Sequence, residues 1–87
     1  MRSLQILAWN VDAFRLACFL SKLTIAQLVE GLHPYGFHLS QAAVLTWRRP
    51  GASGPAHGAI VLALASVLAP TSEERDSLFD ELTGNHE

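Results

Sequence analysis

The chain has 87 residues, of which 49% are hydrophobic and 16% are charged. This apolar content excludes a disordered chain, and the length predicts one small domain near the lower limit for a chain with its own core. The single cysteine, Cys18, excludes an internal disulfide and fits a reducing cytoplasm. Charged residues are fewer than the ~25% typical of soluble domains, which is consistent with a homodimer that covers part of its apolar surface.

The net charge of −2 is unevenly distributed. Residues 1–58 carry five basic and two acidic side chains, whereas residues 59–87 carry one basic and six acidic side chains. A positive first half is weak support for a nucleic-acid partner, and a solubilising acidic tail on an ordinary domain explains it as well. No apolar run reaches the ~20 residues that a membrane helix needs, so we expect no membrane association.

Residues 1–10 are predicted to form an N-terminal arm that packs against the core or a partner, as an extended segment, a short strand or an extra helical turn. The first helix is expected to begin with Asn10 as its cap, or with Asp12 in its first turn, and to end near Lys22. Its apolar face is expected to combine Phe14, Ala17, Cys18 and Ser21 with Leu16, Phe19, Leu20 and Leu23. Cys18 is interpreted as a small core residue.

Two short helices joined by a turn are predicted between Leu23 and Arg49. The first is expected from Thr24 to Leu32 and the second from near Ser40 to near Arg49, with Thr24 and Ser40 as caps. Between them, the sequence His33-Pro34-Tyr35-Gly36 is expected to interrupt the helix. Val44 and Trp47 share a helical face and are expected to point into the core.

Residues 50–57 are predicted to form a linker, followed by a helix over about residues 56–68. Pro55 suits the first turn of that helix, with Ser53 or Gly54 as its cap. That helix is apolar nearly all round, which predicts burial on more than one side. Its expected core residues are Ile60, Leu64, Val67 and Leu68, and its Val61 and Leu62 are assigned to a further surface, either the last helix or a dimer partner.

The last helix is expected to begin at Thr71, because Thr71 and Glu74 have capping-box spacing, and to end near Leu82 or Thr83 before Gly84. Its apolar stripe is Leu78, Phe79 and Leu82. Residues 84–87 are expected to be a frayed tail.

The segment FRLACFLSKLTIAQLVEGL, residues 14–32, resembles the first two helices of the Cro/repressor-like (XRE-type) helix-turn-helix family. The segment SQAAVLTWRRPGASGP, residues 40–55, is similar to that family's second turn helix and the loop after it, and the resemblance extends to about Leu82. It implies an all-α, five-helix lambda-repressor-like DNA-binding domain over residues 1–87. The turn over residues 33–39 is longer than the family pattern by about five residues, which is a thermodynamically inexpensive insertion.

The same resemblance implies a sequence-specific transcriptional regulator, a bacterial or phage repressor, that binds double-stranded DNA as a homodimer. The last helix, the N-terminal arm or both are expected to form the dimer interface. The helix over residues 40–49 would read the major groove, with Gln41, Ala42 and Thr46 at the base-reading positions. A glutamine amide can bond bidentately to adenine, which makes Gln41 the strongest of the three. The phosphate-binding residues implied are Arg48, Arg49, Thr24 and Lys22, with Arg15 as a lesser helper.

A small helical protein-interaction adaptor is the alternative, because the sequence departs from the family at several points. Ile25 replaces a frequent glutamine, Ala42 and Leu45 make the reading face apolar, and Pro50 stands near a usual glycine. Enzyme chemistry is not expected, since no acid–base pair or nucleophile–histidine spacing stands out. No cofactor and no metal are expected either, because the spacing of His33, His38 and His57 matches no standard zinc site.

Overall fold

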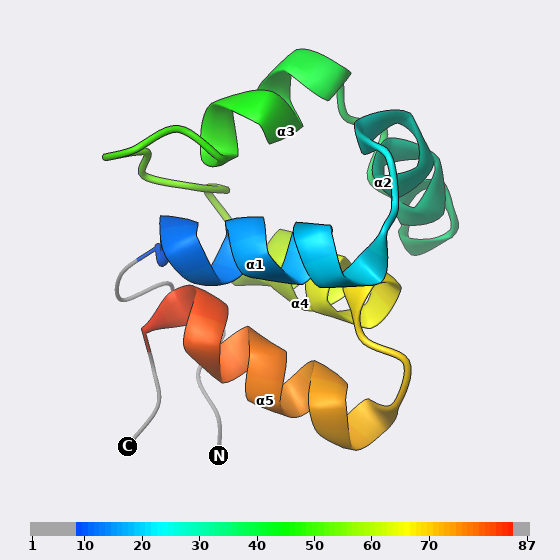
Figure 1. Cartoon of the computed structure of the whole chain (residues 1–87). Coiled ribbons are helices and arrows are strands. Elements are labelled where there is room, and N and C mark those ends of the chain that lie inside the picture. Colours follow the sequence, from blue (N-terminus) through cyan, green and yellow to red (C-terminus); the bar gives the residue numbers. More distant parts are fainter. Residues whose placement is uncertain (1–8, 85–87) are drawn as a thin grey trace.

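The computed structural model describes residues 9–84, and all regular structure in this range is helical. Figure 1 shows the arrangement of the five α-helices. Their bounds are α1 Val11–Ser21, α2 Ile25–Leu32, α3 Gln41–Trp47, α4 Gly58–Leu68 and α5 Ser72–Thr83, and a 3₁₀ turn, η1, covers His33–Tyr35. The prediction of an all-α, five-helix chain is therefore confirmed. Predictions for residues 1–8 and 85–87 fall outside the described residues.

Side-chain caps fix the starts of three helices where the sequence predicts them. The side chains of Asn10, Ser40 and Thr71 each accept a hydrogen bond from the backbone N–H three residues later, at 3.0, 3.2 and 3.1 Å. Each bond satisfies one of the N–H groups that a helix start leaves without a partner. The last helix ends at Gly84, whose left-handed backbone (φ 67°) suits glycine, also as predicted.

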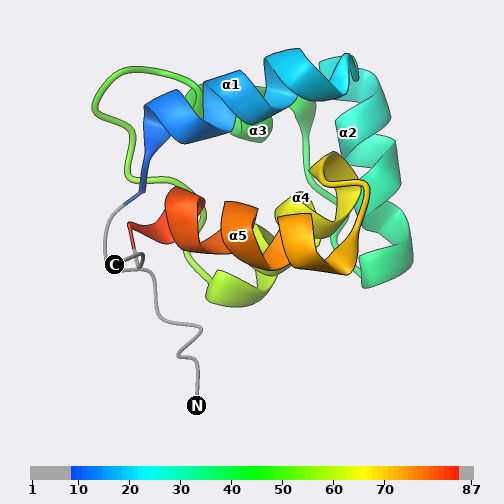
Figure 2. The ribbon, with the colours of Figure 1, turned by 60° about the horizontal axis from the view of Figure 1, so that its bottom comes forward.

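Helix α4 is the centre of the fold, and α2, α1 and α5 pack around it. Figures 1 and 2 show α1 and α5 side by side on one side of α4, and α3 at the far edge beyond α1. Val61 and Leu64 of α4 are fully buried, and so are Phe79 and Leu82 of α5. Val61, which the sequence left for a further surface, is thus covered within the chain itself.

The outward side of α1 contradicts the prediction for that helix. Phe14 and Cys18 are buried as expected, but Leu16, Phe19 and Leu20 are 57, 78 and 66% exposed. Successive residues of an α-helix turn by about 100°, so these three side chains project opposite to Phe14 and Cys18 rather than broadening their face. The result is an apolar patch on the surface of the described chain.

The start of α4 also differs from the prediction. The helix begins at Gly58, three residues after Pro55, and its N-cap position is His57, without a side-chain cap. Gly54 adopts a left-handed backbone (φ 76°) and lies against the Trp9 ring, while Pro55 is buried. These residues pack against the body of the domain, so they do not cap or begin a helix.

One further boundary is corrected. Helix α3 ends at Trp47, and Arg48 and Arg49 lie in the turn that follows, where Pro50 disfavours the helical conformation for Arg49. The α-helix is interrupted after Leu32 as predicted, and residues 33–35 form the 3₁₀ turn η1, which ends at Gly36 with φ 88°. None of the described helices combines the length and apolar character needed to cross a bilayer.

Candidate nucleic-acid interface

Helix α2 supports α3 and is held at its start by a reciprocal cap. The Thr24 hydroxyl oxygen accepts from the Gln27 backbone N–H at 3.1 Å, and the Gln27 side-chain oxygen accepts from the Thr24 N–H at 2.9 Å. The sequence analysis identified Thr24 but missed Gln27, although the spacing Thr-x-x-Gln is the capping-box pattern. The departure at Ile25 has a structural role, because this side chain packs against the core.

Two apolar side chains hold the segment between α2 and α3 against the body of the domain. Phe37 and Leu39 pack against the core, and the Phe37 N–H donates to the Leu32 carbonyl at 3.3 Å. The exposed rings of His33 and His38 lie 4.7 Å apart. Within residues 9–84, no group of three or more metal-binding side chains gathers there or elsewhere.

Helix α3 turns one side inward and one side outward. Val44 is fully buried and Trp47 packs against the core, as the sequence predicts. The exposed side chains of the helix are Gln41, Ala42, Leu45 and Thr46. The three predicted base-reading residues are therefore brought together on one solvent-facing surface, and Leu45 lies among them.

These exposed side chains differ in the contacts they can make. Gln41 stands at the first position of α3, and its amide carries both donors and an acceptor. The Thr46 hydroxyl donates to the Ala42 carbonyl at 2.9 Å, so its hydrogen is used within the helix and its oxygen and methyl group are left for a partner. Ala42 and Leu45, the latter 44% exposed, offer only apolar contact.

The two arginines after α3 have different surroundings. Arg49 is exposed, whereas Arg48 is half-buried. Burial raises the pKa of the Cys18 thiol, and the positive charge of Arg48 opposes that rise, which places Arg48 near α1. Arg49 is therefore the freer of the two to reach a phosphate.

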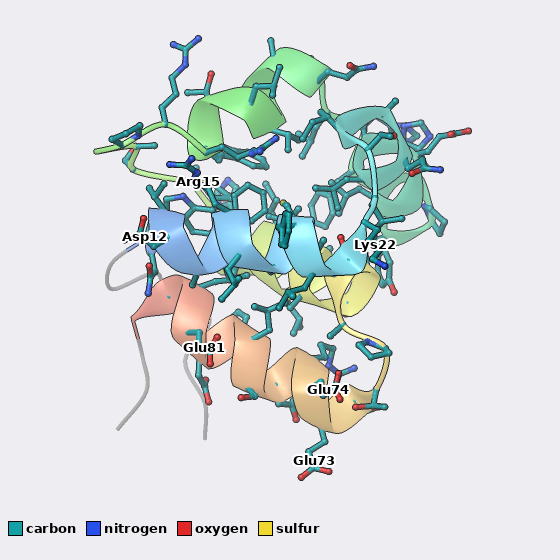
Figure 3. The ribbon with its side chains drawn as sticks, viewed as in Figure 1. Asp12, Arg15, Lys22, Glu73, Glu74 and Glu81 are labelled. Atoms are coloured by element: carbon teal, nitrogen blue, oxygen red, sulfur yellow. The ribbon has the colours of Figure 1, made fainter. Side chains whose placement is uncertain are left out.

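The remaining predicted cations are not gathered around α3. Lys22 is the C-cap of α1 in a left-handed conformation (φ 60°), and Figure 3 shows it at one end of that helix and Arg15 near the other, on the side of α3. Thr24 is exposed at the start of α2, which packs on α3.

Trp9 is a supporting residue that the sequence analysis missed, because it was assigned to the arm. Its indole N–H donates to the Trp47 carbonyl at 2.9 Å, and its ring lies 5.1 Å from that of Phe14. The Asn10 N–H donates to the Leu82 carbonyl at 2.9 Å. Trp9 and Asn10 therefore belong to the folded body, and Trp9 connects the end of α3 to α1.

The charge around α3 favours a polyanionic partner. No acidic residue lies between Glu30 and Glu73, a range that includes η1, α3 and α4. Figure 3 shows Glu73, Glu74 and Glu81 on α5, on the opposite side of α1 from α3. A search of protein families, curated proteins and solved structures found no match for this chain.

Proposed function

We propose that this chain is a sequence-specific DNA-binding regulator of transcription in the cytoplasm, not an enzyme, with a lambda-repressor-like fold in which α2 and α3 form the helix-turn-helix. The observation that carries the proposal is the division of α3 into an inward pair, Val44 and Trp47, and an outward set that begins with Gln41. A short helix held on a rigid body with its other face in solvent is the geometry that enters a major groove.

Each exposed residue of α3 has a role in this proposal. The Gln41 amide bonds adenine through N6 and N7, and the side chains of Ala42 and Leu45 contact thymine methyl groups. Thr46 accepts a bond from a base amino group or adds a further methyl contact. An apolar reading face of this kind selects A·T-rich sites, because thymine alone presents a methyl group in the major groove.

Phosphate contacts position the helix in the groove. Two side chains are proposed for these contacts: Arg49, which follows α3 in the sequence, and Thr24, which precedes it. The Thr24 hydroxyl accepts a bond in the capping box, so its hydrogen remains for a phosphate oxygen. Arg48 contributes charge from its half-buried position. Such contacts fix orientation without reading sequence, and they make affinity depend on salt.

The experiment measures DNA affinity by fluorescence anisotropy for the wild type and Gln41→Ala, on a selected site and on random duplex. We expect Gln41→Ala to lose about 1–3 kcal/mol on the selected site and little on random DNA. Ser77→Ala, an exposed change on α5, is the control and should bind as the wild type does. Equal losses on both DNAs, or no loss at all, would contradict the role of Gln41.

A protein-interaction adaptor is the second candidate, and the exposure of Leu45 and Ala42 favours it. The two functions differ in their response to salt. DNA affinity falls steeply as salt rises because bound counterions are released. Absence of DNA binding even in dilute buffer would favour the adaptor.

A further inference from the structure

The outward face of α1 carries the largest exposed apolar side chains of the described chain. Phe19, Leu20 and Leu16 are 78, 66 and 57% exposed, and they occupy adjacent positions on one side of the helix. Together they present on the order of 400 Å² of apolar surface, within the size range of the largest patch on a typical monomer, a patch that is often functional. The DNA-binding proposal does not use this face.

The patch continues into an apolar groove beside it. A groove of 630 Å³ runs between α1, the end of α4 and α5, and its walls include Leu16, Leu20, Val67, Pro70 and Leu78. Leu16 and Leu20 therefore belong to both the exposed patch and the groove. The three side chains alone supply about half of the ~800 Å² that each partner contributes to a stable interface, and the groove walls add to this area.

Two charged residues near the ends of α1 suit self-association, and Arg15 between them lies on the side of α3. Asp12 stands exposed in the first turn, and Lys22 stands exposed at the C-cap. Figure 3 shows these two residues at opposite ends of the helix. When two copies of such a helix pack antiparallel, the acidic end of each meets the basic end of the other, and the apolar residues between them meet at the centre.

We propose that this face is a homodimer interface, in which α1 packs antiparallel against α1 of a second copy around a two-fold axis. Phe19, Leu16 and Leu20 form its centre, and Asp12 pairs with the partner's Lys22 at each end. A two-fold interface uses the same surface on both copies, so every contact is made twice. Helix α5 borders this contact through the groove, whose walls also include Glu74 and Glu81.

The biological role of this interface rests on the proposed DNA-binding function, because the dimer would present two α3 helices to one duplex. Figures 1 and 2 show α3 beyond α1, on the far side from α5. The two-fold axis of such a dimer lies in the plane of contact and is perpendicular to α1. Rotation about this axis leaves the α3 helices of both copies on the same side of the dimer. The described body measures 32 × 28 × 24 Å, so two copies side by side match the order of the ~34 Å between successive major grooves on one side of a duplex.

The first experiment measures the oligomeric state of the full chain without DNA, by sedimentation velocity over a range of concentrations. We expect a reversible dimer, and Phe19→Glu should raise its dissociation constant by about tenfold or more, because a buried aromatic anchor is replaced by a charge. Tyr35→Glu is the control, since Tyr35 is also an exposed aromatic residue but lies on η1. Circular dichroism establishes that both variants are folded.

The second experiment tests the antiparallel arrangement. Asp12→Lys and Lys22→Asp each place like charges at both ends of the homodimer, so each variant alone should dimerise more weakly than the wild type at low salt. An equimolar mixture restores opposite charges at both ends, and it should form a heterodimer more tightly than either variant forms a homodimer. In a parallel arrangement residue 12 would meet residue 12 and residue 22 would meet residue 22. The wild type would then already have like charges at both ends, and neither variant would dimerise more weakly than the wild type.

A wild-type chain that stays monomeric at several hundred micromolar would overturn the proposal. A dimer that survives Phe19→Glu, or one that is lost in Tyr35→Glu, would overturn it as well. Because no DNA is present, these outcomes are separate from those of the Gln41→Ala experiment. Failure to bind DNA would leave a measured dimer standing.

Discussion

Gly54→Ala perturbs the contact that connects the loop after α3 to Trp9. A Cβ atom at residue 54 would lie 2.4 Å from the Trp9 ring and 2.9 Å from its Cβ, so the whole side chain would have to move. The ring is held by its bond to the Trp47 carbonyl and by its contact with Phe14. The substitution therefore acts on the support of α3 as well as on the loop.

Gly51→Ala is a matched control, because Gly51 has a similar left-handed backbone (φ 79°, against 76° for Gly54) but no atom near its would-be Cβ. The left-handed conformation costs an L-residue about 1–2 kcal/mol at either position. Overpacking adds about 1–3 kcal/mol at residue 54 alone. We therefore expect Gly54→Ala to be less stable than Gly51→Ala by about 2 kcal/mol, or roughly 8–16 °C in melting temperature for a domain of this size.

The assay is thermal and urea unfolding followed by circular dichroism. In a Trp9→Leu background the smaller side chain can move aside, so the penalty of Gly54→Ala should fall to that of Gly51→Ala. Equal destabilisation by the two alanine substitutions in the wild-type background would refute the argument, because it would mean that Trp9 does not pack on Gly54.

Three further predictions concern α2 and the core. Thr24→Ala removes the capping box with Gln27 and should cost ~1 kcal/mol in urea unfolding, whereas Thr24→Ser should cost less; equal losses would contradict the cap. Gly31→Ala should destabilise the chain despite the helix propensity of alanine, because its Cβ would lie 2.9 Å from Val67, and the penalty should disappear in Val67→Ala. Burial raises the pKa of the Cys18 thiol, so the unfolded chain loses the thiol proton at lower pH than the folded chain does. The free energy of unfolding should therefore fall above about pH 9.0. In Cys18→Ala, unfolding curves measured across this pH range should lack that part of the loss.

Local chemistry made the helix starts predictable from the sequence. Asn10, Ser40 and Thr71 cap helices as expected, because a cap depends only on a side chain and the backbone three residues later. The inward direction of Val44 and Trp47 was predictable for a similar reason, since both follow from helical spacing.

Features that depend on distant parts of the chain were missed. Trp9 is far from Gly54 and Trp47 in the sequence, so nothing local indicates that it packs on both. Because Gly54 packs against Trp9, the neighbouring Pro55 does not begin α4, which starts at Gly58. The exposure of Leu16 and Phe19 was missed because both were assigned to one broad apolar face with Phe14 and Cys18, although helical spacing places them on the other side of α1.

The central claim is that the outward face of α3 reads DNA sequence. Selection of bound duplexes from a random DNA pool, followed by sequencing, tests it directly when the wild type, Gln41→Ala and Arg49→Ala are compared. The account predicts an enriched motif for the wild type, loss of preference at one adenine for Gln41→Ala, and an unchanged motif bound more weakly for Arg49→Ala. A pool that shows no enrichment with the folded wild type, or the same motif and strength for all three proteins, would contradict it.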